Sequence, residues 1–179
     1  MPEMKDSGAS RSPSSTPLYR TGIGYDSHRF APGGPLILGG ISLQSDVHLQ
    51  GHSDADAIAH AVTDAILGAC AAGDIGEMFP DTDPANSGRN SMDMLSRAVS
   101  RLNQNGTTVV NVDVTVVTER PRIGPHRADM RAALAKALSI EIERVSIKGK
   151  TNEGMGWIGR GEGIACIAVA TVATVAVHA

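Results

Sequence analysis

The chain has 179 residues, of which 41% are hydrophobic and 3% aromatic, and its formal net charge is −3 at pH 7. This length suits a single compact domain whose core is packed mainly from Val, Ile, Leu and Ala. Because the net charge is negative and the basic residues are scattered, the composition argues against a nucleic-acid-binding protein.

Residues 1–18 are rich in Ser and Pro and lack the apolar stretch of a secretory signal. They predict a disordered N-terminal tail before a single domain over residues 19–179. Cys70 and Cys166 lie in apolar runs without a partner at metal-like spacing, so we expect two buried thiols in a reducing compartment. Since the tail is a poor match to a transit peptide, the cytoplasm of a bacterium is favoured over a plastid.

The first predicted strand begins at Tyr19 and runs into an acidic turn that carries Asp26 and His28. This interpretation places both side chains at the end of a strand. Two short apolar runs, residues 36–38 and 41–43, flank a Gly-Gly pair and predict a β-hairpin.

The first predicted helix covers residues 55–72, where apolar residues recur at helical spacing. Ser53 is expected to cap its N-terminus, since a serine hydroxyl can accept a hydrogen bond from an unpaired N–H group of the first turn. Asp56 and His60 are four residues apart and share a face of this helix, and His52 stands just before it.

The middle of the chain alternates between helical and extended patterns. Residues 73–84 hold two prolines and two glycines and predict a long loop. A second helix is expected at residues 91–104, a strand at 109–117, a third helix at 125–138 and another strand at 145–148.

A glycine-rich loop over residues 152–163 leads to a last predicted strand at 164–177, which carries no charged residue. Because this strand is apolar on both faces, something must cover its second face, and self-association is the simplest explanation. The run is shorter than the ~20 residues that span a bilayer, so no membrane span is expected.

Two clusters of acidic and histidine residues predict a metal centre. Asp26, His28 and His60 would fill three of the four positions of a zinc ion and leave one for substrate. Residues two apart line one face of a strand, and a helical histidine can close the triangle. A single histidine is more often an ordinary hydrogen-bonded residue, so the prediction rests on the whole constellation.

For four other groups of residues, the sequence allows both a functional and a purely structural role. Residues 52–53 form a phosphate site at a helix N-terminus or a simple cap. Residues 81–83 form a turn or accept hydrogen bonds from a polyol. Glu153 is part of a turn or an oxygen ligand for a Mg²⁺ ion already held by phosphates. Arg160 and Glu162 form a surface ion pair or a phosphate clamp.

Five segments carry a resemblance to a known family: GYDSHRF, GHSDADAIAHA, GDIGEMFPDTDP, NVDVTVVTERPRIGPH and GRGEGIACIAV. In order and spacing they resemble the 2-C-methyl-D-erythritol 2,4-cyclodiphosphate synthase family of non-mevalonate isoprenoid biosynthesis. The resemblance runs from about Arg20 to Val177. Five motifs in register are far more specific than any one of them alone.

The resemblance implies an α/β subunit of the α+β type, with a mixed β-sheet that carries helices on one face and packs around the three-fold axis of a homotrimer. Three active sites would lie at subunit interfaces, each with one Zn²⁺ and a Mg²⁺ or Mn²⁺ ion. Family members are cyclising phosphorus–oxygen lyases that convert 4-diphosphocytidyl-2-C-methyl-D-erythritol 2-phosphate, a cytidyl diphosphate, into the cyclic diphosphate and CMP.

The resemblance also assigns roles to individual residues. Asp26, His28 and His60 match the zinc ligands, and Glu153 matches the ligand of the second ion. The positions that match the family's contacts with substrate phosphate, methylerythritol and cytidine are Ser53, Asp74, Ile75, Gly76, Phe79, Pro80, Asp81, Thr82, Asp83, Thr118, Glu119, Arg120, Pro121, Arg122, Ile123, Gly124, Lys150 and Asn152.

Two further pairs of residues acquire roles from the same resemblance. His52 and Thr151 match the catalytic positions that stabilise the transition state. Trp157 and Arg160 match the central cavity, which in some members holds a prenyl diphosphate. Trp157 stands where a phenylalanine is frequent, so a narrower cavity is expected.

Two rivals from other classes stay open. A metal phosphodiesterase or nucleotide hydrolase would use the same aspartate and histidines with water as nucleophile, and its product would be linear. A non-catalytic trimer would bind isoprenoid diphosphates through Arg160 and the apolar central strands. The presence of both the predicted zinc ligands and Glu153 favours an enzyme over the second rival.

Overall fold

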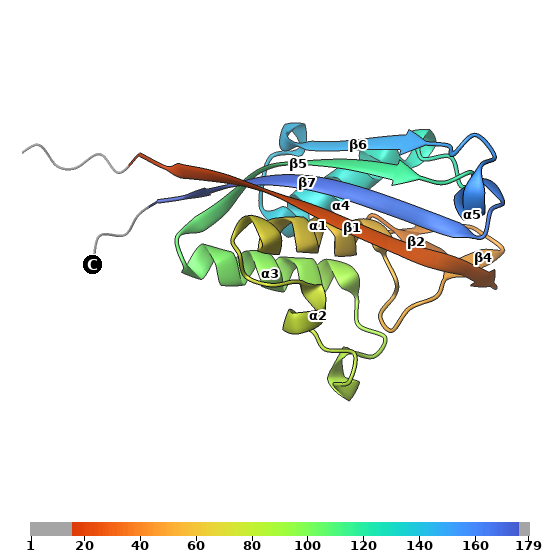
Figure 1. The fold of residues 1–179 in the computed structure, drawn as a ribbon, viewed down its shortest axis with the longest axis horizontal. Helices are drawn as coiled ribbons and strands as arrows, with labels where there is room; N and C mark the ends of the chain where they lie inside the picture. The colour runs from red at the N-terminus through yellow and green to blue at the C-terminus, as the bar shows by residue number, and fades with distance from the viewer. Residues whose placement is uncertain (1–15, 176–179) are drawn as a thin grey trace, which may run out of the picture.

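The computed structural model of the protein describes residues 16–175, in which a five-stranded sheet carries helices on one side (Figure 1). The strand order is β4-β1-β7-β5-β6, with β7 antiparallel to both β1 and β5, and β6 parallel to β5. The mixed sheet with helices on one face is therefore as predicted. Its strands are β1 (Leu18–Pro32), β4 (Val47–Leu49), β5 (Thr107–Val117), β6 (Val145–Lys150) and β7 (Gly163–Thr174).

Strand β1 departs most from its prediction. It is a single strand of 15 residues, so Asp26 and His28 lie in its interior and the expected turn is wrong. The reason is tertiary: β1 pairs with β7 without interruption from Leu18 opposite Thr174 to Arg29 opposite Gly163. A continuous ladder outweighs the weak local turn preference of glycine, aspartate and serine. Most of the predicted N-terminal tail lies outside the described residues.

The predicted hairpin is confirmed as β2 (Leu36–Leu38) and β3 (Ile41–Leu43), which pair antiparallel around Gly39 and Gly40. Both glycines have positive φ, 61° and 77°, the backbone region that two-residue hairpin turns require. The hairpin forms a separate two-stranded sheet.

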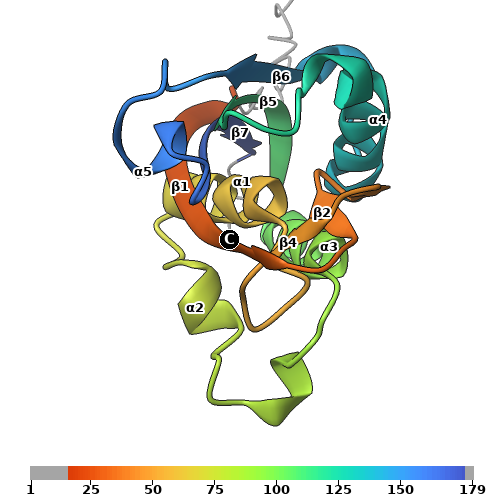
Figure 2. The same cartoon turned by 90° about the vertical axis from the view of Figure 1, so that its right-hand side faces the viewer.

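Three helices cover the inner side of the main sheet. They are α1 (Ala57–Ala69), α3 (Ser91–Gln104) and α4 (Arg127–Leu138). In Figure 2, α1 and α3 lie below β5 and β7, and α4 lies beside these strands on the right. The bounds of α3 match the prediction, whereas α1 is shorter than predicted at both ends and α4 follows a 3-10 turn at Gly124–His126.

Two predicted loops contain short helices. The segment after α1 holds α2 (Ile75–Met78), because Asp74 caps it by accepting a hydrogen bond from the N–H of Glu77. The loop before β7 holds α5 (Gly156–Gly159). In Figure 2, α2 and the segment that follows it project away from the helical layer.

The core is aliphatic, as the composition predicted. Side chains such as Ile58, Leu95, Leu134 and Ile164 are fully buried between the helices and the sheet. Cys166 is buried and Cys70 is half-buried, and both are free thiols. Within residues 16–175, no helix is long and apolar enough to cross a membrane.

The outer face of the sheet is apolar at its centre, and no part of residues 16–175 covers it. Ile23 on β1 is 70% exposed and its partner Val169 on β7 is 38% exposed. The neighbouring pair Tyr25 and Ile167 is also exposed, as is Tyr19 at the end of β1. Within the described residues, only one side of the predicted two-faced apolar strand is thus covered.

Candidate active site

Two side chains from β1 meet one from α1 to form a compact cluster. Nε2 of His28 lies 2.9 Å from Oδ2 of Asp26, and Nδ1 of His60 lies 3.2 Å from the same oxygen. The two imidazole nitrogens are 3.3 Å apart. One potential ligand atom from each residue lies within 4.8 Å of the other two. The structure therefore brings the three predicted zinc ligands together.

Two glycines on β1 allow this meeting. A Cβ at Gly24 would lie 1.9 Å from the carbonyl oxygen of Ala61, and one at Gly22 would lie 2.2 Å from that of Ala65. Any side chain at either position would therefore push α1 away from the strand. Because His60 precedes Ala61 on α1, this close approach places its ring beside the two β1 ligands.

The orientation of His28 is fixed by a backbone group. Nδ1 of His28 lies 2.6 Å from the carbonyl oxygen of Gln50. A carbonyl oxygen can only accept, so Nδ1 carries a proton, and in the neutral ring Nε2 keeps its lone pair. The nitrogen that faces Asp26 and His60 is thus the one able to bind a cation.

His60 has polar partners on its other side. Its Nε2 lies 3.0 Å from the hydroxyl oxygen of Ser53 and 2.9 Å from that of Ser91. Ser91 is the first residue of α3 and is fully buried. The sequence analysis missed Gln50 and Ser91, since neither belongs to an acidic-histidine motif.

The charges in the cluster support one another. Burial acts to raise the pKa of Asp26, but the hydrogen bonds and charges of His28 and His60 lower it to about 2. Burial acts to lower the pKa of His28, but Asp26 and the carbonyl of Gln50 outweigh burial and raise it above the usual 6.5. Both shifts favour the ionised pair, a carboxylate beside a protonated imidazole, over the pair of neutral groups.

When the imidazole of His28 is protonated, a cation that binds through Nε2 must displace the proton on that nitrogen. Because the pKa of His28 is raised, we expect the affinity for zinc to fall as the pH falls, and the fall to begin above pH 6.5. Displacement of one proton predicts about a tenfold loss per pH unit below that pKa. Competition with a chromophoric chelator between about pH 6 and about pH 8 measures this dependence, and a flat profile would contradict it.

The donor atoms of the cluster fit zinc. Two imidazole nitrogens and one carboxylate oxygen converge on one point, and zinc in catalytic sites takes three such protein ligands and keeps a fourth position open. The three side chains are half-buried, so a small ligand can reach that position.

Asp56 is not part of this cluster. It is fully buried and its carboxylate accepts hydrogen bonds from the N–H groups of Gly39 and Gly40, at 2.8 and 2.6 Å, and from two N–H groups of α1. Asp56 therefore caps α1 and anchors the β2–β3 turn to it. The prediction that Ser53 caps this helix is wrong, because its hydroxyl faces His60 and Ser91.

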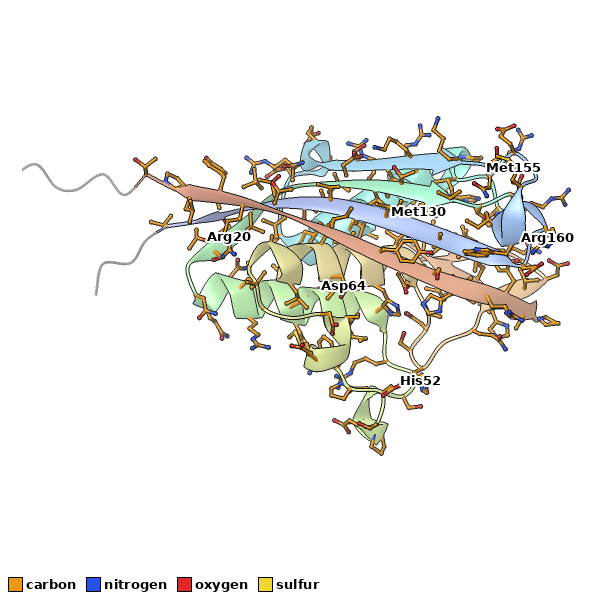
Figure 3. All side chains as sticks on the ribbon, in the orientation of Figure 1. Arg20, His52, Asp64, Met130, Met155 and Arg160 are labelled. Carbon is orange, nitrogen blue, oxygen red and sulfur yellow. The ribbon has the colours of Figure 1, made fainter. Side chains whose placement is uncertain are left out.

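His52 lies on the projecting side of the molecule (Figure 3). Its side chain is 76% exposed, and its Nε2 lies 3.9 Å from Oδ2 of Asp81. Its carbonyl oxygen accepts a hydrogen bond from the N–H of Gly88. The structure thus brings the segments around residues 52 and 81 together.

Other predicted contacts on this side are occupied by local hydrogen bonds. Asp74 caps α2, Asp83 accepts from the N–H of Ala85, and the N–H of Ile75 donates to Asp64. Gly76 belongs to α2. Phe79 packs under the guanidinium of Arg89 at 5.7 Å. The remaining predicted contacts, Pro80 and Thr82, are exposed.

A separate cleft of about 1250 Å³ lies at the end of the sheet where β1, β5 and β6 finish. Its predicted members are the segment 118–124, Lys150, Thr151 and Arg160. Ile123 in that segment is a core residue, so a ligand would contact mainly its backbone. The lining residues that sequence reasoning missed are Phe30, Gln44, Ser45, Asp46, Val47, Arg127, Gly149, Gly159 and Gly161.

The loop after β6 is held by Glu119, a predicted substrate contact. Its carboxylate accepts hydrogen bonds from the N–H groups of Asn152 and Gly154, at 2.9 and 3.3 Å. Glu153 is exposed, has a positive φ of 51°, and accepts a hydrogen bond from the hydroxyl of Thr151 at 2.9 Å. The predicted ligand of the second ion thus presents its carboxylate to solvent near the cleft.

Arg160 and Trp157 lie at the same end of the molecule, around α5 (Figure 3 labels Arg160). Nε of Arg160 lies 2.6 Å from Oε1 of Glu162, and both side chains are exposed, so the surface ion pair is present. Trp157 is 38% exposed. The residues that line the 1250 Å³ cleft do not include Asp26, His28 or His60. One chain thus presents two separate groups of predicted site residues.

Comparison with known proteins places this geometry in a family. Residues 19–173 match the YgbB family. A 2-C-methyl-D-erythritol 2,4-cyclodiphosphate synthase from Gemmatimonas aurantiaca is 63% identical over 155 residues, which cover 87% of this chain and 93% of that protein.

Solved structures agree with the sequence comparison. The bifunctional IspDF from Campylobacter jejuni superposes with a TM-score of 0.85 at 36% identity, over 89% of this chain and 43% of that longer one. IspF of Plasmodium falciparum, solved as a CDP complex, superposes with a TM-score of 0.77 at 32% identity, over 88% and 97% of the two chains. The chain therefore belongs to the YgbB family, together with proteins named 2-C-methyl-D-erythritol 2,4-cyclodiphosphate synthase.

Proposed function

We propose that the protein converts 4-diphosphocytidyl-2-C-methyl-D-erythritol 2-phosphate into 2-C-methyl-D-erythritol 2,4-cyclodiphosphate and CMP. The observation that carries this proposal is the Asp26, His28 and His60 cluster in a chain so similar to synthases of that name. An oxygen of the 2-phosphate attacks the β-phosphorus, the bond from that phosphorus to the bridging oxygen breaks, and CMP leaves. No water is consumed, so the enzyme is a cyclising phosphorus–oxygen lyase.

The cluster would hold one Zn²⁺ per chain, and Glu153 would be the protein ligand of a Mg²⁺ or Mn²⁺ ion that the substrate diphosphate also binds. The two ions would supply positive charge that orients the phosphates and stabilises the charge that builds on them during transfer. Glu153 suits this role because its carboxylate is exposed and its loop is anchored by Glu119. Carboxylate oxygens are preferred ligands of both ions.

His52, Ser53 and Thr151 would bind the reacting phosphates. The exposed imidazole of His52 stands ahead of the N-terminus of α1, where N–H dipoles favour anions. Hydrogen-bond donors aimed at the phosphate oxygens stabilise the transition state, in which negative charge is spread over these oxygens. Asp81 beside His52 would accept hydrogen bonds from the methylerythritol hydroxyls, with Phe79, Pro80 and the segment around α2 forming the rest of that wall.

The cleft beyond β5 would hold the cytidine end of the substrate. Backbone groups of residues 118–124 and the positive charges of Arg120, Arg122, Arg127 and Lys150 line it, which suits a nucleoside diphosphate. The similarity to an IspF solved as a CDP complex supports the same class of ligand.

We further propose a homotrimer, with the sheets packed around a three-fold axis. In one chain the cleft and the metal cluster form separate groups, so a substrate that spans both needs the cleft of one subunit beside the cluster of the next. The exposed apolar centre of the sheet, with Ile23 and Val169 as partners on adjacent strands, supplies a surface that such packing would bury.

A lysine at Ile23 should separate the subunits. Burying an unpaired ammonium group in an interface costs several kcal/mol, so Ile23→Lys is expected to sediment as a monomer at ~10 µM. The unmodified protein is expected to sediment as a trimer at the same concentration. Ser100→Lys, on the exposed surface of α3, is the matched control and should stay trimeric. A monomeric unmodified protein in the same experiment would contradict the trimer.

Trp157 and Arg160 would face the central cavity of this trimer, where a prenyl diphosphate is a candidate ligand. Arg160 is paired with Glu162 in the structure, so a diphosphate would have to compete with that carboxylate. The bulk of Trp157 would narrow the cavity relative to a phenylalanine. We place the enzyme in the cytoplasm of a bacterium, in line with its bacterial relatives.

Phosphorus NMR tests the reaction directly. Zinc-loaded protein given the cytidyl diphosphate substrate and Mg²⁺ should produce the cyclic diphosphate together with CMP, and a chelator should abolish both. A linear product would contradict this proposal and indicate a hydrolase. Binding of an isoprenoid diphosphate without formation of any product would also contradict it and indicate the non-catalytic trimer.

A further inference from the structure

We propose that Ser91 and Asp54 are positioning residues that fix which nitrogen of His60 carries a proton. In this arrangement Asp54, Ser91 and His60 form a hydrogen-bonded relay that keeps the proton on Nε2 and leaves the lone pair on Nδ1 for the metal ion. The role in metal binding rests on the zinc centre proposed above, whereas the position of the proton can be measured without metal.

Hydrogen bonds link Asp54, which precedes α1, to Ser91 at the start of α3 and Ser91 to His60 on α1. Nε2 of His60 is 2.9 Å from the hydroxyl oxygen of Ser91. That hydroxyl in turn makes a short hydrogen bond to Oδ1 of Asp54, and the N–H of Ser91 donates to Oδ2 of the same carboxylate at 3.1 Å. Asp54 thus binds both donors of Ser91.

The direction of each hydrogen bond follows from this geometry. Both oxygens of Asp54 accept, since the N–H of Asp56 also donates to Oδ1 at 3.3 Å. The hydrogen bond between Ser91 and Asp54 therefore uses the hydroxyl proton of Ser91, which the carboxylate accepts. With that proton committed, the Ser91 oxygen can only accept in its 2.9 Å contact with Nε2, and this contact assigns Nε2 of His60 as the N–H donor.

The proton position on His60 needs to be fixed because Asp26 competes for the same proton. Oδ2 of Asp26 lies 3.2 Å from Nδ1 of His60 and can accept a proton from it. In the absence of the relay, this carboxylate would draw the proton of a neutral His60 to Nδ1, the nitrogen that the metal needs. Ser53 sets no direction by itself, because its hydroxyl lies 3.0 Å from Nε2 of His60 and 3.2 Å from the hydroxyl oxygen of Ser91 and can donate to either. Among the described residues it has no carboxylate partner that would fix its proton.

The relay is also held rigidly. Ser91 is fully buried as the first residue of α3, and the backbone N–H of Asp54 donates to the carbonyl oxygen of Arg89. Outer groups of this kind orient a metal-binding histidine, and their loss commonly weakens metal binding by about 10–100-fold. For His28, a single group fixes the proton position: the carbonyl oxygen of Gln50 accepts a hydrogen bond from Nδ1.

The test compares two variants of equal shape. Ser91→Val and Ser91→Thr add the same branch at Cβ, but only threonine keeps the hydroxyl. We expect Ser91→Val to weaken zinc binding about 10–100-fold in a chelator competition, and Ser91→Thr to stay within about threefold of the unmodified protein. Long-range proton–nitrogen NMR of histidine-labelled, metal-free protein at alkaline pH should show the His60 proton on Nε2 in the unmodified and threonine proteins and on Nδ1 in the valine protein.

Two further variants keep the test decisive. Ser91→Ala replaces Ser91→Val if valine prevents folding, and it should behave in the same way. Ser96→Ala removes an exposed hydroxyl from the same helix and should leave both readouts unchanged. Cobalt-substituted protein adds a spectrum of the metal site, which should change only in the valine and alanine proteins.

Folded Ser91→Val or Ser91→Ala protein that binds zinc normally and keeps the His60 proton on Nε2 would overturn the relay. If the unmodified protein bound no zinc, the proposed metal centre would fail, while the proton position in the metal-free variants would still decide whether the relay exists.

Discussion

Replacing His60 with alanine is expected to abolish turnover while the trimer stays intact. The change removes one of three side chains that converge within 4.8 Å, and a site with two ligands should not retain zinc at micromolar concentration. The positive charge that zinc supplies to a phosphoryl transfer is worth several kcal/mol, so we expect the rate to fall by at least about a thousandfold, or about 4 kcal/mol. Alanine is a good helix former, so α1 should persist.

His48→Ala is the matched control for this variant. His48 is an exposed histidine on β4 whose ring contacts the carbonyl of Gly33 rather than the cluster. Metal analysis should give one zinc per chain in the control and far less in His60→Ala. Undiminished turnover in a zinc-free His60→Ala protein would refute the metal assignment.

Gly24→Ala is expected to destabilise the fold and the metal centre together. The new methyl group would lie 1.9 Å from the carbonyl oxygen of Ala61 and 2.7 Å from the N–H nitrogen of Ala65, and both are backbone atoms that move only with α1. Overpacking costs typically 1–3 kcal/mol, and a clash with backbone should reach about 3 kcal/mol. Displacement of α1 would also draw His60 away from Asp26 and weaken zinc binding.

Gly68→Ala tests whether this effect comes from the close approach. Gly68 lies on α1, but its nearest neighbour for an added methyl is the carbonyl oxygen of Ile23 at 3.9 Å, an ordinary contact. Alanine there should be neutral or stabilise the protein by up to about 1 kcal/mol. Urea denaturation of both metal-free variants measures the difference, and equal stabilities would contradict the steric explanation.

Sequence patterns correctly predicted the helices and strands that are stabilised by residues close in sequence. Helix α3 has the predicted bounds because Asn90 caps it by accepting a hydrogen bond from the N–H of Asp93, and because its apolar residues form one stripe. The β2–β3 hairpin was predictable because Gly39 and Gly40 meet the backbone demands of its turn.

Elements governed by distant partners were predicted less well. The strand through Asp26 and His28 continues because β7 pairs along its whole length, and no local signal shows that partner. The cap of α1 is Asp56 rather than Ser53, because the β2–β3 turn brings two N–H groups to the carboxylate of Asp56. In both cases a contact distant in sequence outweighed a local preference.

The sequence by itself determined the chemistry of the candidate site: one carboxylate and two imidazoles, from segments whose residue types and spacing suit a metal, and a resemblance to one enzyme family. Only the tertiary structure decided how these groups are held. The glycines of β1 set the approach of α1, the carbonyl of Gln50 orients His28, and Ser91 contacts His60 from 31 residues away. Ligand identity depends on side-chain type, which a sequence states directly, whereas orientation depends on distances between segments that only folding brings together.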